Sequence, residues 1–203
     1  MMNNYLCKNN DSMAKTTNPF IVTGKIEPEY FCDRVTESAR LVKSVTNGNN
    51  MVIISPRRMG KTGLIQFCYD KPEIADEYYT FFIDILHTSS LREFTYLLGR
   101  EIYETLLPRS RKMANLFIQT IKSISGKFGF DPITGMPTFN VELGDIDRPE
   151  YTLDEIFQYL ARADKPCIVA IDEFQQIAKY PEKNIEAQLR THIQKLRNCN
   201  FIF

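Results

Sequence analysis

The sequence contains 203 residues, of which 43% are hydrophobic and 25% are charged, and its 25 basic residues balance its 25 acidic residues. This composition is typical of a globular protein with a substantial core, and a zero net charge gives no field that would attract nucleic acid or an acidic membrane surface. The five cysteines form no Cys-x-x-Cys pair and no apolar run reaches the length of a membrane span. We therefore expect a protein of the reducing cytoplasm with no membrane contact.

The chain begins with a polar, asparagine-rich stretch, residues 1–18, which we expect to be a disordered tail. Residues 19–24 (PFIVTG) are expected to be extended and to lie over a pocket. Residues 33–46 carry apolar side chains at helical spacing, and Asn47, Gly48 and Asn49 follow as a stop signal, so this segment is predicted to be an amphipathic helix. The side chains at that spacing are Val35, Ala39, Val42 and Val45.

Residues 50–69 have the order of strand, loop and helix that a phosphate-binding loop requires. Residues 51–54 form an apolar run of the length of a buried parallel strand, and residues 55–62 read SPRRMGKT. Backbone N–H groups of such a loop bind phosphate oxygens, and the dipole of the following helix adds positive charge. Ser55 stands where a glycine is usual and Pro56 has no N–H, so an ordinary strand-to-helix turn remains the alternative.

Three residues of this loop have the chemistry of a nucleotide site. Gly60 permits close approach of the backbone to phosphate, Lys61 neutralises β- and γ-phosphate oxygens, and the hydroxyl of Thr62 is a ligand for Mg²⁺. The loop residues expected to contact nucleotide are Ser55, Pro56, Arg57, Arg58, Met59, Gly60, Lys61, Thr62 and Gly63. Arg57 and Arg58 are the weakest of these candidates, because arginines in loops are commonly solvated.

The middle of the chain is predicted to alternate strands and helices and to carry one hairpin. Residues 77–85 form an apolar strand with Asp84 near its end, where we expect it to cap the next turn, with an auxiliary role beside Asp172 as the alternative. Helices are predicted at residues 91–107, at residues 109–125, and from a capping box formed by Thr152 and Glu155 to Ala163. Residues 126–143 alternate polar and apolar side chains around a turn at residues 131–135, which predicts a β-hairpin.

A second candidate site follows a short apolar strand, residues 165–173, that ends in two carboxylates. Open α/β sheets bind ligands at the carboxyl ends of their parallel strands. We expect Asp172 to hold Mg²⁺ and Glu173 to activate the water that attacks the γ-phosphate, with Lys61 as the second catalytic residue. A solvated Asp-Glu pair at a helix start is the alternative. If both motifs form one site, Thr62 and Asp172 must lie close enough to share a cation.

The SPRRMGKT loop, the IVAIDEF strand and the run from Phe31 to Arg34 resemble the archaeal-type ATPases, including bacterial members, of the AAA+/STAND branch of P-loop NTPases. The resemblance implies a three-layer α/β/α fold with a mainly parallel sheet of order 5-1-4-3-2, in which residues 200–203 are strand four. It also implies ATP with Mg²⁺, and adenine contacts from Phe31 and Arg34, although the Gly and Glu of the family's Phe-x-Gly-Arg-Glu motif are absent. Relatives continue with a sensor residue, a fifth strand and a winged helix. Residues 19–203 are therefore expected to be a P-loop ATPase domain that lacks strand 5, is truncated at its C-terminal side and turns over poorly.

Three functions fit these motifs. The favoured one is a Mg²⁺-dependent ATPase domain that acts as a conformational switch, read by a protein partner or through self-association. A nucleic-acid-engaging AAA+ module is the second, expected only in a full-length form because the chain is neutral. A small-molecule P-loop kinase is the third, although Glu173 beside Asp172 favours activation of water. Gln175 and Gln176 either face the nucleotide or face solvent.

Overall fold

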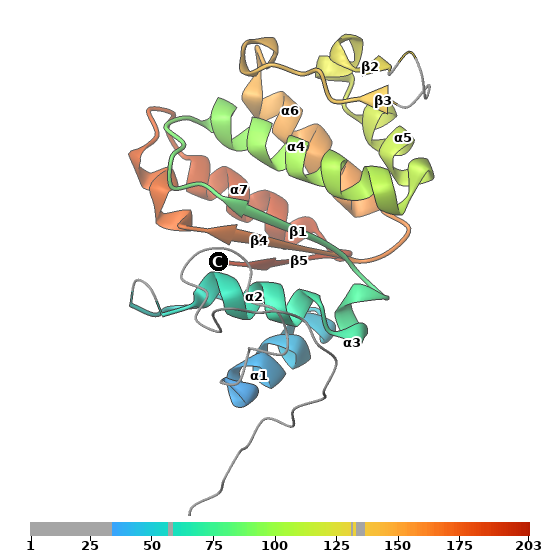
Figure 1. Ribbon diagram of the computed structural model, residues 1–203. Coiled ribbons are helices and arrows are strands. Elements are labelled where there is room, and N and C mark those ends of the chain that lie inside the picture. Colours follow the sequence, from blue (N-terminus) through green and yellow to red (C-terminus); the bar gives the residue numbers. More distant parts are fainter. Residues whose placement is uncertain (1–33, 57–58, 131, 133–136) are drawn as a thin grey trace, which may run out of the picture.

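The computed structural model describes residues 34–56, 59–130, 132 and 137–203. A parallel sheet lies in the middle of the molecule with helices on both faces (Figure 1). Its strands are β1 (Tyr79–Asp84), β4 (Cys167–Asp172) and β5 (Cys199–Ile202). β4 pairs with β1 on one side and with β5 on the other, so the strand with the two carboxylates is central.

The run that leads into the predicted phosphate loop lies beside β5. Met51 forms a parallel bridge with Ile202, and three backbone hydrogen bonds of 2.6 to 2.9 Å continue the pairing. The spatial order is therefore this run, β5, β4 and β1, which confirms the expected order 1-4-3-2. The prediction that residues 51–54 are buried holds for one face only, because Met51 and Ile53 pack against the core whereas Val52 and Ile54 are 66% and 92% exposed. Among the described residues this run has a neighbouring strand on one side only.

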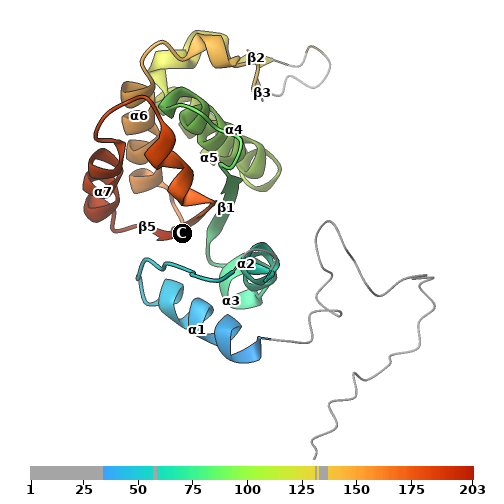
Figure 2. The same ribbon diagram turned by 90° about the vertical axis from the view of Figure 1, so that its left-hand side faces the viewer.

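Two groups of helices complete a three-layer α/β/α arrangement (Figure 1, Figure 2). One face of the sheet is covered by α1 (Val35–Thr46), α2 (Lys61–Tyr69) and α3 (Pro72–Ala75). The other face is covered by α4 (Leu91–Arg109), α6 (Pro149–Arg162) and α7 (Ile185–Lys195), with α5 (Arg111–Thr120) packed on α4 and α6. The short 3-10 helices in the described part of the chain are η2 (Lys122–Lys127), η3 (Leu143–Asp145) and η4 (Phe174–Lys179).

The alternation of side chains along β4 builds two hydrophobic cores, because successive residues of a strand point to opposite faces. Cys167, Val169 and Ile171 pack on the side of α4, α6 and α7, whereas Ile168 and Ala170 pack on the side of α1 and α2. Since both faces are covered, the buried part of this strand is apolar throughout, as expected for a parallel sheet.

The buried side of α1 agrees with the predicted one at Val45 and in part at Val42, and differs in the first half of the helix. The helix is present, but Val35 is 76% exposed and Ala39 is also exposed. The buried residues are Ser38, Leu41 and Val45. Ser38 can be buried because its hydroxyl donates to the carbonyl of Val35 at 2.9 Å. A pattern that counts only apolar side chains misses such a serine and therefore places the buried stripe wrongly.

The capping box predicted at Thr152 and Glu155 is wrong, because α6 already begins at Pro149. Glu155 lies inside the helix and is 4% exposed. Its carboxylate accepts hydrogen bonds from the backbone N–H groups of Lys122 and Ser123, both at 3.1 Å, and from the Ser123 hydroxyl at 2.6 Å. Glu155 therefore caps the first turn of η2 instead of its own helix.

The region between α4 and α6 is more broken than predicted. The helix expected over residues 109–125 is divided into α5 and η2. The hairpin is confirmed in part, since β2 (Gly129–Phe130) pairs antiparallel with β3 (Pro137–Thr138), while most of its predicted turn lies outside the described residues. The rings of Phe128 and Phe139 each lie within 5.7 Å of the Tyr103 ring, which attaches the hairpin to α4.

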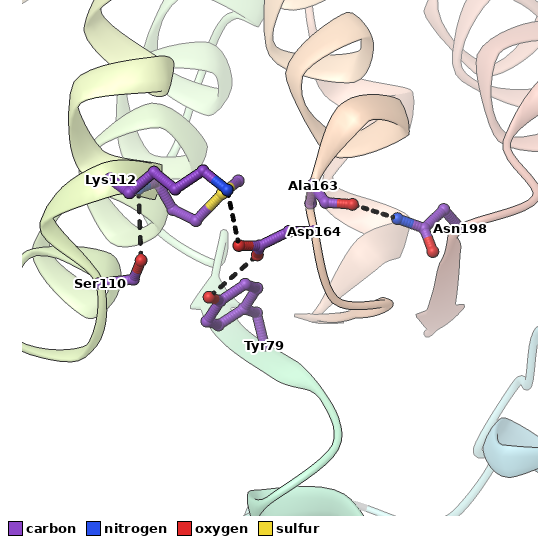
Figure 3. A network of polar contacts seen from close by, with 7 residues as sticks. Tyr79, Ser110, Lys112, Ala163, Asp164 and Asn198 are labelled. Carbon is purple, nitrogen blue, oxygen red and sulfur yellow. Dashed lines mark hydrogen bonds and ion pairs between the residues drawn. The ribbon is translucent and has the colours of Figure 1, made fainter.

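Polar contacts hold the amino ends of the strands (Figure 3). The Tyr79 hydroxyl donates to Asp164 at 3.2 Å, and the Lys112 ammonium group lies 3.8 Å from the same carboxylate. The side-chain amide of Asn198 donates to the carbonyl of Ala163 at 2.9 Å. Tyr79 opens β1, and the other partners precede β4 and β5 or begin α5. The network therefore lies at the opposite end of the sheet from the candidate site.

Buried thiol and phenol groups are expected to make the fold sensitive to alkali. Burial raises the pKa of Cys68 from 9.0 to about 11, that of Cys167 to about 12, and that of Tyr69 well above 10.0. The unfolded chain therefore loses these protons first, so the contribution of these groups to stability should be constant below about pH 9 and fall as the pH rises toward about 12. Circular-dichroism melting curves across this range test the prediction. A melting temperature that does not fall there would contradict it.

Candidate functional site

The predicted phosphate loop ends at the amino terminus of α2, which begins at Lys61. Gly60 precedes it in a left-handed conformation, with φ 71° and ψ 31°, which glycine adopts without strain. The N–H of Leu64 donates to the carbonyl of Gly60 at 3.0 Å and closes the first turn. The N–H groups of a first helical turn have no partner within the helix, so they are available to an anion.

The structure joins this helix to the end of β4 through two of the predicted site residues. The Thr62 hydroxyl donates to Oδ2 of Asp172 at 2.7 Å, although the two residues are 110 positions apart in the sequence. Oδ1 of the same carboxylate accepts the N–H of Glu173 at 3.0 Å. Thr62 and Asp172 are therefore close enough to share one cation.

Glu173 occupies the turn between β4 and η4 with a backbone that is unusual for its type. Its φ of 56° and ψ of 36° are left-handed, which raises the free energy of a non-glycine residue by about 1 kcal/mol. The amide nitrogen of Gln175 donates to Oε2 of Glu173 at 2.5 Å. The next residue, Gln176, points elsewhere and donates to the carbonyl of Thr88 at 2.9 Å.

A cavity of about 420 Å³ lies where the loop, α2 and β4 meet. This volume is in the range of small-molecule sites. The polar residues that line it are Ser55, Lys61, Asp172, Glu173 and Gln175. Its apolar wall includes Val52, Ile54, Phe174 and Phe203. The cavity therefore combines a cationic group, two carboxylates and apolar surface next to a helix start.

The donor set fits Mg²⁺. This ion prefers oxygen ligands and usually keeps several waters, so one hydroxyl and one carboxylate are enough when phosphate oxygens complete its shell. No group of three or more His, Cys, Asp or Glu residues that could hold a metal occurs in the described part of the chain. The chemistry and spacing of Thr62 and Asp172 suit the ion.

The other predicted residues have mixed placements. Arg34 precedes α1 in a left-handed conformation, and its guanidinium lies 4.0 Å from the position that a Cβ on Gly60 would take, so it reaches the loop. Pro56 and Met59 are exposed, and Gly63 is half-buried in α2. Phe31, Arg57 and Arg58 lie outside the described residues.

Asp84 lies opposite Asp172 in the register of β1 and β4. It accepts the N–H of Leu86 at 2.9 Å, so it caps the following turn as predicted.

Two aromatic residues of the cavity were not predicted. Phe174 follows Glu173 directly, and its ring centre lies 4.4 Å from that of Phe203. Both residues line the cavity. Only the position of Phe174 after the carboxylates could have drawn attention to it, because a contact between the ends of two strands leaves no local sequence pattern.

No described helix is long and apolar enough to cross a membrane.

Comparisons with known proteins support the fold. No family model and no curated protein matches the sequence. Among solved structures, the chain is similar to the Walker-type ATPase of Pyrococcus abyssi, with 19% identity and a TM-score of 0.54 over 91% of this chain and 48% of that one. It is also similar to the ORC1 protein of Aeropyrum pernix, solved in complex with DNA, with 13% identity and a TM-score of 0.48 over 86% of this chain and 40% of that one. The chain shares the α/β fold of the Pyrococcus abyssi structure and spans about half of its length.

Proposed function

We propose that this chain is an ATP-binding, Mg²⁺-dependent ATPase domain that works as a conformational switch in the cytoplasm. The observation that supports the proposal most strongly is the 2.7 Å contact between Thr62 and Asp172. It joins the start of a helix that follows a glycine-containing loop to a strand end that carries two acids. This combination binds a triphosphate and a divalent cation together.

The residues in and around the cavity have defined tasks in this proposal. The N–H groups of the first turn of α2 and the ammonium group of Lys61 bind phosphate oxygens, and Ser55 and Gly60 shape the loop around them. Thr62 and Asp172 hold Mg²⁺, which neutralises charge on the β- and γ-phosphates when bound. The apolar wall with Phe174 excludes water from one side of the site. Arg34 and Phe31 are proposed to contact the base.

Hydrolysis then needs a base for water, and Glu173 has that role. Its carboxylate accepts a proton as the water oxygen forms a bond to the γ-phosphorus. The bond between that phosphorus and the bridging oxygen breaks, and the electron pair leaves with ADP. Lys61 stabilises the negative charge that develops on the phosphate oxygens. Because Thr62 and Asp172 belong to α2 and β4, loss of the γ-phosphate alters the link between these elements, and a protein partner or a second copy reads the change.

Affinity for ATP, measured with and without Mg²⁺, tests this proposal. Wild type should bind more tightly with Mg²⁺, and Asp172→Asn should lose most of that gain because a neutral amide is a poor Mg²⁺ ligand. Glu173→Gln should keep the affinity and release phosphate at least about 100-fold more slowly, because an amide cannot take the proton. An ATP affinity of wild type that is the same with and without Mg²⁺ would show that Thr62 and Asp172 do not form the proposed ion site.

A further inference from the structure

We propose that Gln175 is a positioning residue that orients the carboxylate of Glu173 for the attacking water. The inference rests on the proposed hydrolysis of ATP and adds a residue to it. The amide nitrogen of Gln175 donates to Oε2 of Glu173 at 2.5 Å, and both residues line the cavity that also contains Lys61. This contact assigns a task to a glutamine whose sequence position is compatible with facing either nucleotide or solvent.

The local backbone explains why Gln175 rather than its neighbour makes this contact. The left-handed conformation of Glu173 turns the chain at the end of β4, and the N–H of Gln176 donates to the carbonyl of Glu173 at 2.9 Å, which closes the first turn of η4. In a 3-10 helix successive side chains lie about 120° apart. Gln175 is therefore directed back to Glu173 while Gln176 reaches the loop after β1.

The residues on both sides of Gln175 are themselves held in place. Gln176 is bonded to the carbonyl of Thr88 at 2.9 Å, and the ring of Phe174 packs 4.4 Å from that of Phe203. These contacts tie η4 to the loop after β1 and to the residue that follows β5. A donor on such a supported segment is preorganised, so it can restrict its partner more than an equally exposed free side chain can.

The hydrogen bond from Gln175 leaves the carboxylate of Glu173 able to act as a base. A carboxylate has two oxygens, so with Oε2 bonded to Gln175 a water can still be bound through Oε1. The amide of Gln175 is neutral and does not titrate, so it does not compete for the proton that Glu173 takes. A glutamate side chain with no such partner samples several rotamers, and the fraction of time in the reactive geometry falls.

The test is single-turnover hydrolysis of Mg-ATP with the protein in excess, together with ATP affinity, for wild type and Gln175→Met. Methionine keeps the length of the side chain and removes the amide. The expected result is hydrolysis about tenfold slower with unchanged affinity, because one hydrogen bond to a charged group is lost. Gln158→Met is the matched control, since it removes the same kind of bond, 2.7 Å to Asp154, on the exposed side of α6. Its rate should equal that of wild type.

A double-mutant cycle with Glu173→Gln separates positioning from general damage. Gln175→Met should slow hydrolysis no further when Glu173 is already glutamine, because its effect acts through that carboxylate. Equal slowing in both backgrounds, a wild-type rate in Gln175→Met, or a faster rate would each overturn the inference. The inference would also be overturned if wild type bound ATP but did not hydrolyse it with Glu173 as the base. That last result would leave the binding part of the proposed function intact, whereas failure to bind Mg-ATP at all would overturn the proposed function itself.

Discussion

Lys61→Ala is expected to weaken the binding of Mg-ATP about 100-fold. Lys61 is the first residue of α2 and lines the same cavity as Asp172 and Glu173. Its ammonium group would donate charge-assisted hydrogen bonds to phosphate oxygens, and such bonds contribute up to about 3 kcal/mol, which corresponds to about two factors of ten in affinity. Equilibrium binding of a fluorescent ATP analogue, competed with ATP, measures the effect.

Lys43→Ala is the control for this change, because Lys43 is an exposed lysine in the last turn of α1. It removes the same charge from the protein without touching the cavity, so its affinity should match that of wild type. If the two variants bind Mg-ATP equally well, the nucleotide does not lie against α2. Thermal melting of Lys61→Ala should be close to that of wild type, because the residue is only half-buried.

Glu155→Ala is expected to lower the free energy of unfolding by about 3 kcal/mol. Its carboxylate accepts three hydrogen bonds from Lys122 and Ser123 in a setting where Glu155 is 4% exposed. Removing it takes this acceptor from the two N–H groups at the start of η2 and opens a gap between α6 and η2. Urea unfolding followed by circular dichroism gives the value.

Two comparisons sharpen this stability test. Glu155→Gln keeps an acceptor oxygen and should lose less than the alanine variant. Glu150→Ala, at an exposed position in the first turn of the same helix, should lose less than about 1 kcal/mol. A similar loss for Glu150→Ala and Glu155→Ala would mean that Glu155 does not cap η2.

The strands of the sheet could be predicted because burial on both faces leaves a continuous apolar run, as in β4. The failures arise where burial depends on contacts that the pattern of apolar side chains does not show. Residues 51–54 have the composition of a buried strand but expose Val52 and Ile54 at the margin of the described sheet. Ser38 is buried because of a bond to its own helix, and Glu155 faces another segment instead of its own helix start.

The candidate site could also be predicted only in part. Thr62 and Asp172 could be named because each lies in a short motif whose chemistry is local, and the structure places them in contact. The wall formed by Phe174 and Phe203 could not, because it arises where two strand ends meet. The hydrogen bond from Gln175 to Glu173 could not be predicted either, because it depends on a left-handed backbone at Glu173 that the sequence does not indicate.

That left-handed turn at Glu173 has a practical consequence for anyone engineering the protein. For folding alone, glycine would suit position 173 better, because it adopts φ of 56° without a penalty. A library screened only for heat resistance would therefore reward the loss of this side chain. Under the proposed mechanism, the variants that survive heating best would include some that have lost the ability to hydrolyse ATP.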